Sequence, residues 1–215
     1  MNLHNTPNDN QLSQKIKLEE MQLLYGGTPF SYTASVIFAF IIYNVLLGHA
    51  ASETNLNIWL TAILAVLLIR SIESYRFSKI SEHQQLESGW RTRFFIGTGI
   101  AGLCWGLLPW LGYSSEIEYL SFIIVCLVGV IAGSLATLSY RWEAQALFLL
   151  PSSLLLVLRL AIDEQNFSNA TAFVLLVFIL FSSISSTRIF NNTQQNIRLR
   201  LEADSREHAI GLMHQ

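Results

Sequence analysis

Charged residues that lie within or beside long apolar stretches are the side chains with the clearest potential for chemistry. They are Arg70, Glu73, Arg141, Glu143 and Arg159. An ionised group inside a lipid bilayer is costly, so such residues mark ligand sites, ion pathways or proton relays by default. All except Arg159 fall at the ends of these stretches, where a long side chain can extend to water. The competing interpretation is therefore that these charges are simply solvated at helix ends. No chain of charges crosses the middle of these stretches.

Five residues form the candidate ligand-binding set: Trp105, Trp110, Arg141, Glu143 and Arg159. Catalysis has no comparable candidates, because no nucleophile stands beside a general base in a recognisable motif. The five histidines all fall in termini or loops: His4, His49, His83, His208 and His214. We therefore expect no catalytic residue, no cofactor and no enzyme activity in this chain.

Metal and disulfide chemistry are not expected either. Cys104 and Cys126 each lie inside an apolar segment, where a thiol behaves as a small hydrophobe. There is no CxxC motif and no cysteine–histidine cluster, so a metal site has no support. The G-x-G-x-x-G pattern of Gly97, Gly99 and Gly102 follows no strand and therefore does not predict a dinucleotide site.

Glycines spaced four residues apart indicate helix packing instead. Gly102 and Gly106 form one pair, and Gly129 and Gly133 form another in the next apolar stretch. Small residues at this spacing allow two membrane helices to approach closely. We predict that the third and fourth spans pack together through these four glycines.

The elements that must position these residues are membrane helices. Of the 215 residues 52% are hydrophobic and only 13% are charged, whereas a soluble domain has about 25% charged residues. Runs of about 20 apolar residues cross a bilayer as helices, and the pattern lacks the alternation of a barrel. We predict an all-α integral membrane fold with six spans: Phe30–Gly48, Asn57–Ile72, Phe94–Tyr113, Tyr119–Leu138, Trp142–Ile162 and Ala170–Ile189.

Basic residues predict the orientation of this six-helix bundle. The connections His49–Leu56, Ser114–Glu118 and Asp163–Asn169 hold no Lys or Arg. Of the 13 Lys and Arg residues, all except Arg159 fall on the other side. Because basic loops stay in the cytoplasm, both termini are predicted to be cytoplasmic.

Three segments follow from this topology. Residues 1–28 are a cytoplasmic segment with a short amphipathic helix, and residues 29–189 are the six-helix domain. Residues 190–215 continue as a charged helix without Pro, which we interpret as a juxtamembrane signalling helix. An ordinary juxtamembrane helix is the alternative.

Several stretches resemble the polytopic N-terminal sensor regions of bacterial diguanylate cyclases, cyclic-di-GMP phosphodiesterases and hybrid histidine kinases. The resemblance lies in residues 20–25 (EMQLLY), 90–94 (WRTRF), 101–106 (AGLCWG) and 196–203 (NIRLRLEA), and covers most of the chain from about residue 18. It implies an input module whose catalytic part would follow Gln215. Neither a GGDEF-type loop nor a phospho-accepting histidine segment occurs in the chain.

The function expected from these features is a sensory module of the bacterial inner membrane. It would act as a homodimer and pass a signal to a cytoplasmic output domain in the same polypeptide, in cyclic-di-GMP or two-component signalling. A small transporter or channel is the alternative from another class, and a plain membrane anchor is a third. The net charge of −2 gives no support for binding nucleic acid.

Overall fold

The described part of the chain is helical throughout. The computed structural model describes residues 7–114, 116–162 and 166–213, and within these ranges it contains no strand. Parts of the predicted segments and connections, residues 1–6, 115, 163–165 and 214–215, lie outside the described residues. In chain order the helices are α1 (Pro7–Gly26), α2 (Thr28–Leu46), α3 (Glu53–Phe77), α4 (Glu82–Gln85), α5 (Ser88–Gly106), α6 (Leu108–Leu111), α7 (Ile117–Leu138), α8 (Trp142–Ile162) and α9 (Asn166–Met213).

Six of these segments are long and apolar enough to cross a membrane, as predicted. In lipid every backbone N–H and C=O must be satisfied within the segment, which favours uninterrupted helices. The architecture is therefore that of a multi-pass membrane protein. The candidate spans are Gln14–Leu46, Glu53–Phe77, Gly89–Leu111, Ile117–Leu138, Trp142–Ile162 and Asn169–Arg200.

Local sequence signals explain several helix boundaries. Gly27 separates α1 from α2, and Pro29 occupies the first turn of α2, where its missing N–H costs nothing. Ser52 caps α3 by accepting a hydrogen bond from the backbone N–H of Asn55 at 3.3 Å. α5 stops at Gly106, and the chain resumes as the short helix α6, with Pro109 in its first turn.

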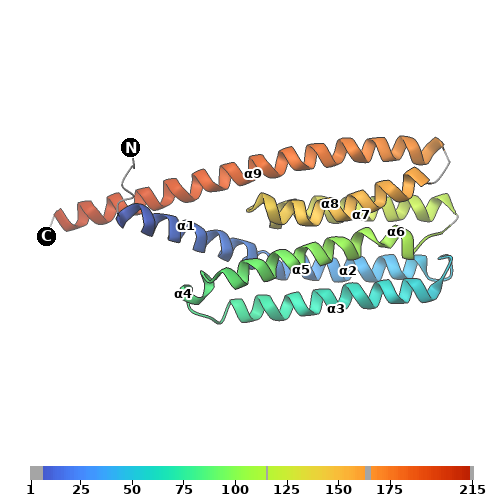
Figure 1. Ribbon diagram of the computed structural model, residues 1–215, viewed down its shortest axis with the longest axis horizontal. Helices are drawn as coiled ribbons and strands as arrows, with labels where there is room; N and C mark the ends of the chain where they lie inside the picture. Colours follow the sequence, from blue (N-terminus) through green and yellow to red (C-terminus); the bar gives the residue numbers. More distant parts are fainter. Residues whose placement is uncertain (1–6, 115, 163–165, 214–215) are drawn as a thin grey trace.

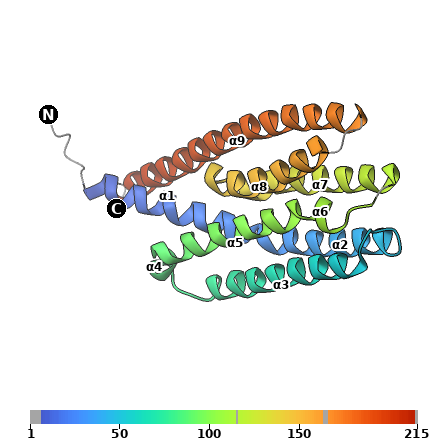
Figure 2. The ribbon, with the colours of Figure 1, turned by 45° about the vertical axis from the view of Figure 1, so that its right-hand side comes forward.

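The helices form an elongated bundle with α9 along its full length (Figures 1 and 2). α8 packs between α9 and α5, α3 packs on α5 and α2, and α7 contacts α2 and α8. α1 lies at one end, where it contacts α9, α4, α2 and α7. We call this end, formed by α1, α4 and the turn between α7 and α8, the basic end.

The predicted packing of the third span on the fourth is wrong for Gly102 and Gly106. Both glycines face α8, the fifth span. A Cβ added to Gly102 would lie 2.6 Å from the carbonyl oxygen of Phe148, and one added to Gly106 would lie 2.5 Å from that of Pro151. No real Cβ tolerates such distances, so the α5–α8 contact requires glycine at both positions.

The second glycine pair lies in more open space. A Cβ on Gly129 would approach only the ring of Phe38, at 4.0 Å, and one on Gly133 would meet nothing within 4 Å. Helical spacing predicts that such glycines share a face, but it does not say which neighbour that face meets. This is why the prediction found a packing surface on α5 and assigned it to the wrong helix.

Candidate functional site

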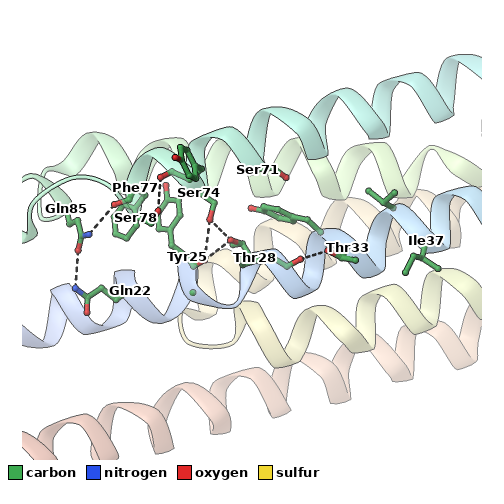
Figure 3. A pocket seen from close by; sticks show the side chains of 15 residues that line it. Gln22, Tyr25, Thr28, Thr33, Ile37, Ser71, Ser74, Phe77, Ser78 and Gln85 are labelled. Carbon is green, nitrogen blue, oxygen red and sulfur yellow. Dashed lines mark hydrogen bonds between the residues drawn. The ribbon is translucent and has the colours of Figure 1, made fainter.

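A groove of about 810 Å³ runs along the basic end, between α1 and α2 on one side and α3 and α4 on the other (Figure 3). Its volume falls within the range of about 300–1,000 Å³ typical of small-molecule sites. None of the residues that line it carries a formal charge. Its polar lining consists of hydroxyl and carboxamide side chains: Gln22, Tyr25, Thr28, Tyr32, Thr33, Ser71, Ser74, Tyr75, Ser78 and Gln85.

Helical spacing brings the hydroxyl groups to the groove. Ser71 and Ser74 on α3 and Ser78 at its C-cap follow one another at intervals of three and four residues, so they share one face. Thr28 and Tyr32 are four residues apart on the facing helix α2. The two rows meet where the hydroxyl oxygens of Thr28 and Ser74 lie 2.6 Å apart. This spacing was visible in the sequence, although our candidate set did not include it.

Contacts from α1 close one end of the groove (Figure 3). Gln22 Nε2 donates to Gln85 Oε1 at 3.1 Å, and Gln85 Nε2 donates to the carbonyl oxygen of Phe77 at 3.2 Å. The Tyr25 ring stacks on Phe77 with centroids 3.9 Å apart, and its hydroxyl donates to the carbonyl oxygen of Trp90 at 3.1 Å. The end of α1 is therefore fixed to α3, α4 and α5 together.

The groove is lined by uncharged polar groups and apolar surface. Its lining contains no carboxylate, imidazole, amine or thiol. It offers hydroxyl and amide groups beside apolar surface from residues such as Val36 and Ile37. An uncharged ligand with a few hydrogen-bonding groups on an apolar body matches this lining.

A buried carboxylate joins α1 to α9. Glu20 is 5% exposed and accepts hydrogen bonds from the guanidinium of Arg141 and the side-chain amide of Gln194. Arg141 Nε also lies 3.6 Å from Glu143 Oε2, and Arg91 Nη2 lies 3.5 Å from Glu143 Oε1. We call these five side chains, which come from α1, α5, α8, α9 and the turn before α8, the Glu20 cluster.

Partners from distant parts of the chain make the Glu20 cluster possible. A carboxylate removed from water is stable only when it is paired and hydrogen-bonded, and Glu20 has both kinds of partner. Arg141 lies 121 residues away and Gln194 lies 174 residues away along the chain. Spacing rules within a single helix therefore could not find this contact.

The five predicted ligand-binding residues do not form one site. Arg141 and Glu143 meet in the Glu20 cluster, at the basic end. Trp110 and Arg159 meet at the opposite end, with Arg159 Cζ 6.0 Å from the Trp110 ring. Trp105 is 1% exposed and lies in the interior between them. None of the five lines the groove.

Arg159 is held by aromatic rings at the end of the bundle away from α1. Its Cζ lies 4.0 Å from the ring centroid of Tyr113, a cation–π distance. Trp110 is oriented there by a hydrogen bond from its Nε1 to the carbonyl oxygen of Leu155 at 3.0 Å. Local packing contacts therefore account for the positions of both Arg159 and Trp110.

Arg70 does not extend to water, contrary to the helix-end interpretation. It is 6% exposed, its Nε donates to the Tyr32 hydroxyl at 3.0 Å, and its Cζ lies 5.2 Å from the Tyr32 ring and 5.1 Å from the Phe94 ring. The reason is that α3 continues beyond the predicted end of the second span, to Phe77. Arg70 therefore stands well inside the bundle.

The described residues contain no group of three His, Cys, Asp or Glu side chains that could hold a metal ion. Both cysteines are free thiols. Comparisons with protein-family models, with curated proteins and with solved structures gave no match.

Proposed function

We propose that this chain is a sensory module of the bacterial inner membrane that controls a cytoplasmic output domain through α9. The output domain belongs to the same polypeptide and is a diguanylate cyclase or a histidine kinase, and the working unit is a homodimer. The observation that carries this proposal is the position of Glu20. It holds α9 through Gln194, while residues on the same helix line the groove.

Helix α1 supplies the path from the groove to α9. Gln22 and Tyr25 line the groove, and Glu20 lies within two turns of both on the same helix. A ligand that displaces Tyr25 from Phe77 moves α1 and with it the partner of Gln194. A ligand can shift α9 in this way only if it binds the two arrangements of α1 with different affinities.

Helix α9 has the length and continuity of a transmitting element. Its 48 residues span about 72 Å, whereas a hydrocarbon core is about 30 Å thick. Ser182 and Ser186 are buried where α9 packs on the bundle, and Ser186 Oγ has no hydrogen-bond partner among the described residues. Small side chains, one of them without a polar partner among the described residues, favour sliding or rotation of α9.

Changing the phase of α9 tests this proposal. The full chain is joined through Gln215 to a diguanylate cyclase domain, and residues are inserted after Arg200, beyond the contact of Gln194 with Glu20. One inserted residue rotates the output domain by about 100°, and seven nearly restore its phase. We expect cyclase activity to change with one inserted residue and to recover in large part with seven.

The matched control is a chain with a flexible Gly-Ser segment of seven residues at the same position. It adds the same length but breaks the helical register, so it should not restore activity. Cyclase activity that is the same for all insert lengths and compositions would mean that α9 is only a tether. The membrane-anchor interpretation would then replace the sensory one.

A further inference from the structure

A second cavity, of about 120 Å³, lies deeper in the bundle and opens between α2 and α7. Its mouth is bordered by Phe30, which is 79% exposed, and by Gly129 and Gly133, which add no side chain to the opening. Arg70 and Trp105 line its inner part. We call this cavity the Arg70 cleft.

Arg70 brings an unpaired positive charge into the cleft. The Nε–Tyr32 hydrogen bond is its only hydrogen bond among the described residues, and no carboxylate oxygen of those residues lies within 4 Å of the guanidinium. An arginine stays protonated in a protein, so its charge cannot be removed by titration. Burial of such a charge without an anion costs several kcal/mol. The two terminal nitrogens therefore remain available as donors for an anion.

The geometry of a guanidinium selects the class of anion. Its planar fork of N–H groups matches the two oxygens of a carboxylate, or of a phosphate, in a bidentate pair. The rings of Tyr32 and Phe94 lie within 5.2 Å of Arg70 Cζ and exclude water on those sides. An anion in this site is thus held by strong, poorly screened hydrogen bonds.

The shape of the cleft selects an amphiphile. Its volume lies far below the roughly 300 Å³ of sites that enclose a drug-sized molecule, so only a head group fits inside. Arg70 stands seven residues, about 10 Å, from the end of α3, whereas Phe38 and Gly129 line the cleft farther from the basic end. The cleft thus runs along the membrane normal, as an acyl chain does.

We propose that the Arg70 cleft binds the carboxylate of a long-chain fatty acid that enters from the bilayer between α2 and α7. The carboxylate pairs with the Arg70 guanidinium, and the hydrocarbon chain lies against Phe38 and Val130 at the mouth. A phospholipid phosphate offers the same charge, but its glycerol and second acyl chain require a wider opening. This assignment concerns binding and does not depend on control of an output domain by α9.

Equilibrium binding of radiolabelled oleate to the purified chain in a nonionic detergent tests the proposal. We expect saturable binding, at least ten-fold weaker in Arg70→Gln and partly retained in Arg70→Lys. The matched control is Arg76→Gln, which removes the same charge from an exposed position of α3 and should leave affinity unchanged. Equal affinity of Arg70→Gln and the unaltered chain would overturn the proposal.

A second variant keeps Arg70 in place and closes the mouth. Gly133→Leu adds a side chain where a Cβ meets no heavy atom within 4 Å, so the fold should be retained while oleate binding weakens at least ten-fold. Unchanged binding in Gly133→Leu would overturn the entry between α2 and α7.

Competition with other lipids tests the head group. If oleyl alcohol competed with labelled oleate as effectively as unlabelled oleate does, the role of the carboxylate would be overturned. Displacement of oleate by lower concentrations of dioleoyl phosphatidylglycerol would overturn the fatty acid in favour of a phosphate.

Discussion

Glu20 and Arg70 are buried charges with very different surroundings. Glu20 is paired with Arg141 and hydrogen-bonded to Gln194, so its removal from water is offset by two donors. Arg70 has one hydroxyl partner and two aromatic faces, but no anion among the described residues. The Glu20 carboxylate thus has its partners within the chain and holds helices together, whereas the Arg70 guanidinium keeps N–H donors for an anion.

Removal of the Glu20 charge should loosen α1 from α9. In Glu20→Gln one acceptor and the ion pair are lost, so we expect the chain to be less stable by about 1–3 kcal/mol. Thermal unfolding in detergent measures the effect, and Glu19→Gln, the neighbouring position outside the Glu20 cluster, is the control. The double variant Glu20→Gln/Arg141→Gln should lose less than the sum of the single variants, because they share one contact. Additive losses would show that the two side chains do not interact.

At the scale of elements, the helices could be predicted from the sequence and their neighbours could not. Lipid requires long apolar helices, so apolar runs located all six spans. Contacts between helices depend on which faces meet in space, and Gly102 and Gly106 therefore gave the right kind of contact with the wrong partner. The end of α3 at Phe77 was also missed, because charged Arg70 and Glu73 resembled a helix end.

Glycines of the two pairs should respond differently to the same substitution. Gly102→Ala and Gly106→Ala place a Cβ within 2.6 Å of a backbone oxygen of α8, and overpacking of this kind costs about 1–3 kcal/mol. Gly133→Ala meets no neighbour and improves helix propensity, so it should be neutral or stabilising by up to about 1 kcal/mol. Melting temperatures of the three variants in one detergent measure the difference. A loss at Gly133 equal to that at Gly102 would contradict the α5–α8 contact.

The candidate site, like the fold, could be predicted from the sequence only in part. The hydroxyl row Ser71, Ser74 and Ser78 could have been found from its helical spacing. The contact of Gln22 with Gln85 could not, because its partners lie 63 residues apart and on different helices. Arg141 and Glu143 were identified from their charge near a membrane boundary. Glu20, the buried partner of Arg141, lies on a segment that was predicted only as an amphipathic helix.

At the scale of the whole molecule, the two ends of the bundle differ in charge. Arg76 lies in the last turn of α3, Lys79 follows that helix, and Arg91 and Arg93 lie near the start of α5, all at or near the basic end, whereas Arg159 lies in the last turn of α8, toward the other end. The excess of basic residues at one end of a membrane bundle predicts that this end faces the cytoplasm. The orientation of both termini remains a prediction from this asymmetry.

Labelling with a membrane-impermeant maleimide in intact cells tests the orientation. In a chain with Cys104 and Cys126 changed to alanine, Ala51→Cys lies in the turn between α2 and α3 and should be labelled. Glu87→Cys is exposed at the start of α5 and should be labelled only after the cells are opened. The reverse pattern would place the basic end outside the cytoplasm and remove the basis for a cytoplasmic output domain.

The contact of Glu20 with Gln194 also sets an order of events during synthesis. Gln194 is made 174 residues after Glu20, which takes about 9–35 s at translation rates of about 5–20 residues per second. During that interval α1 can pack on α3 and α5 through Tyr25, but Glu20 lacks its partner on α9. Closure of the Glu20 cluster therefore comes late in synthesis, because it requires that α9 has been made and docked on the bundle.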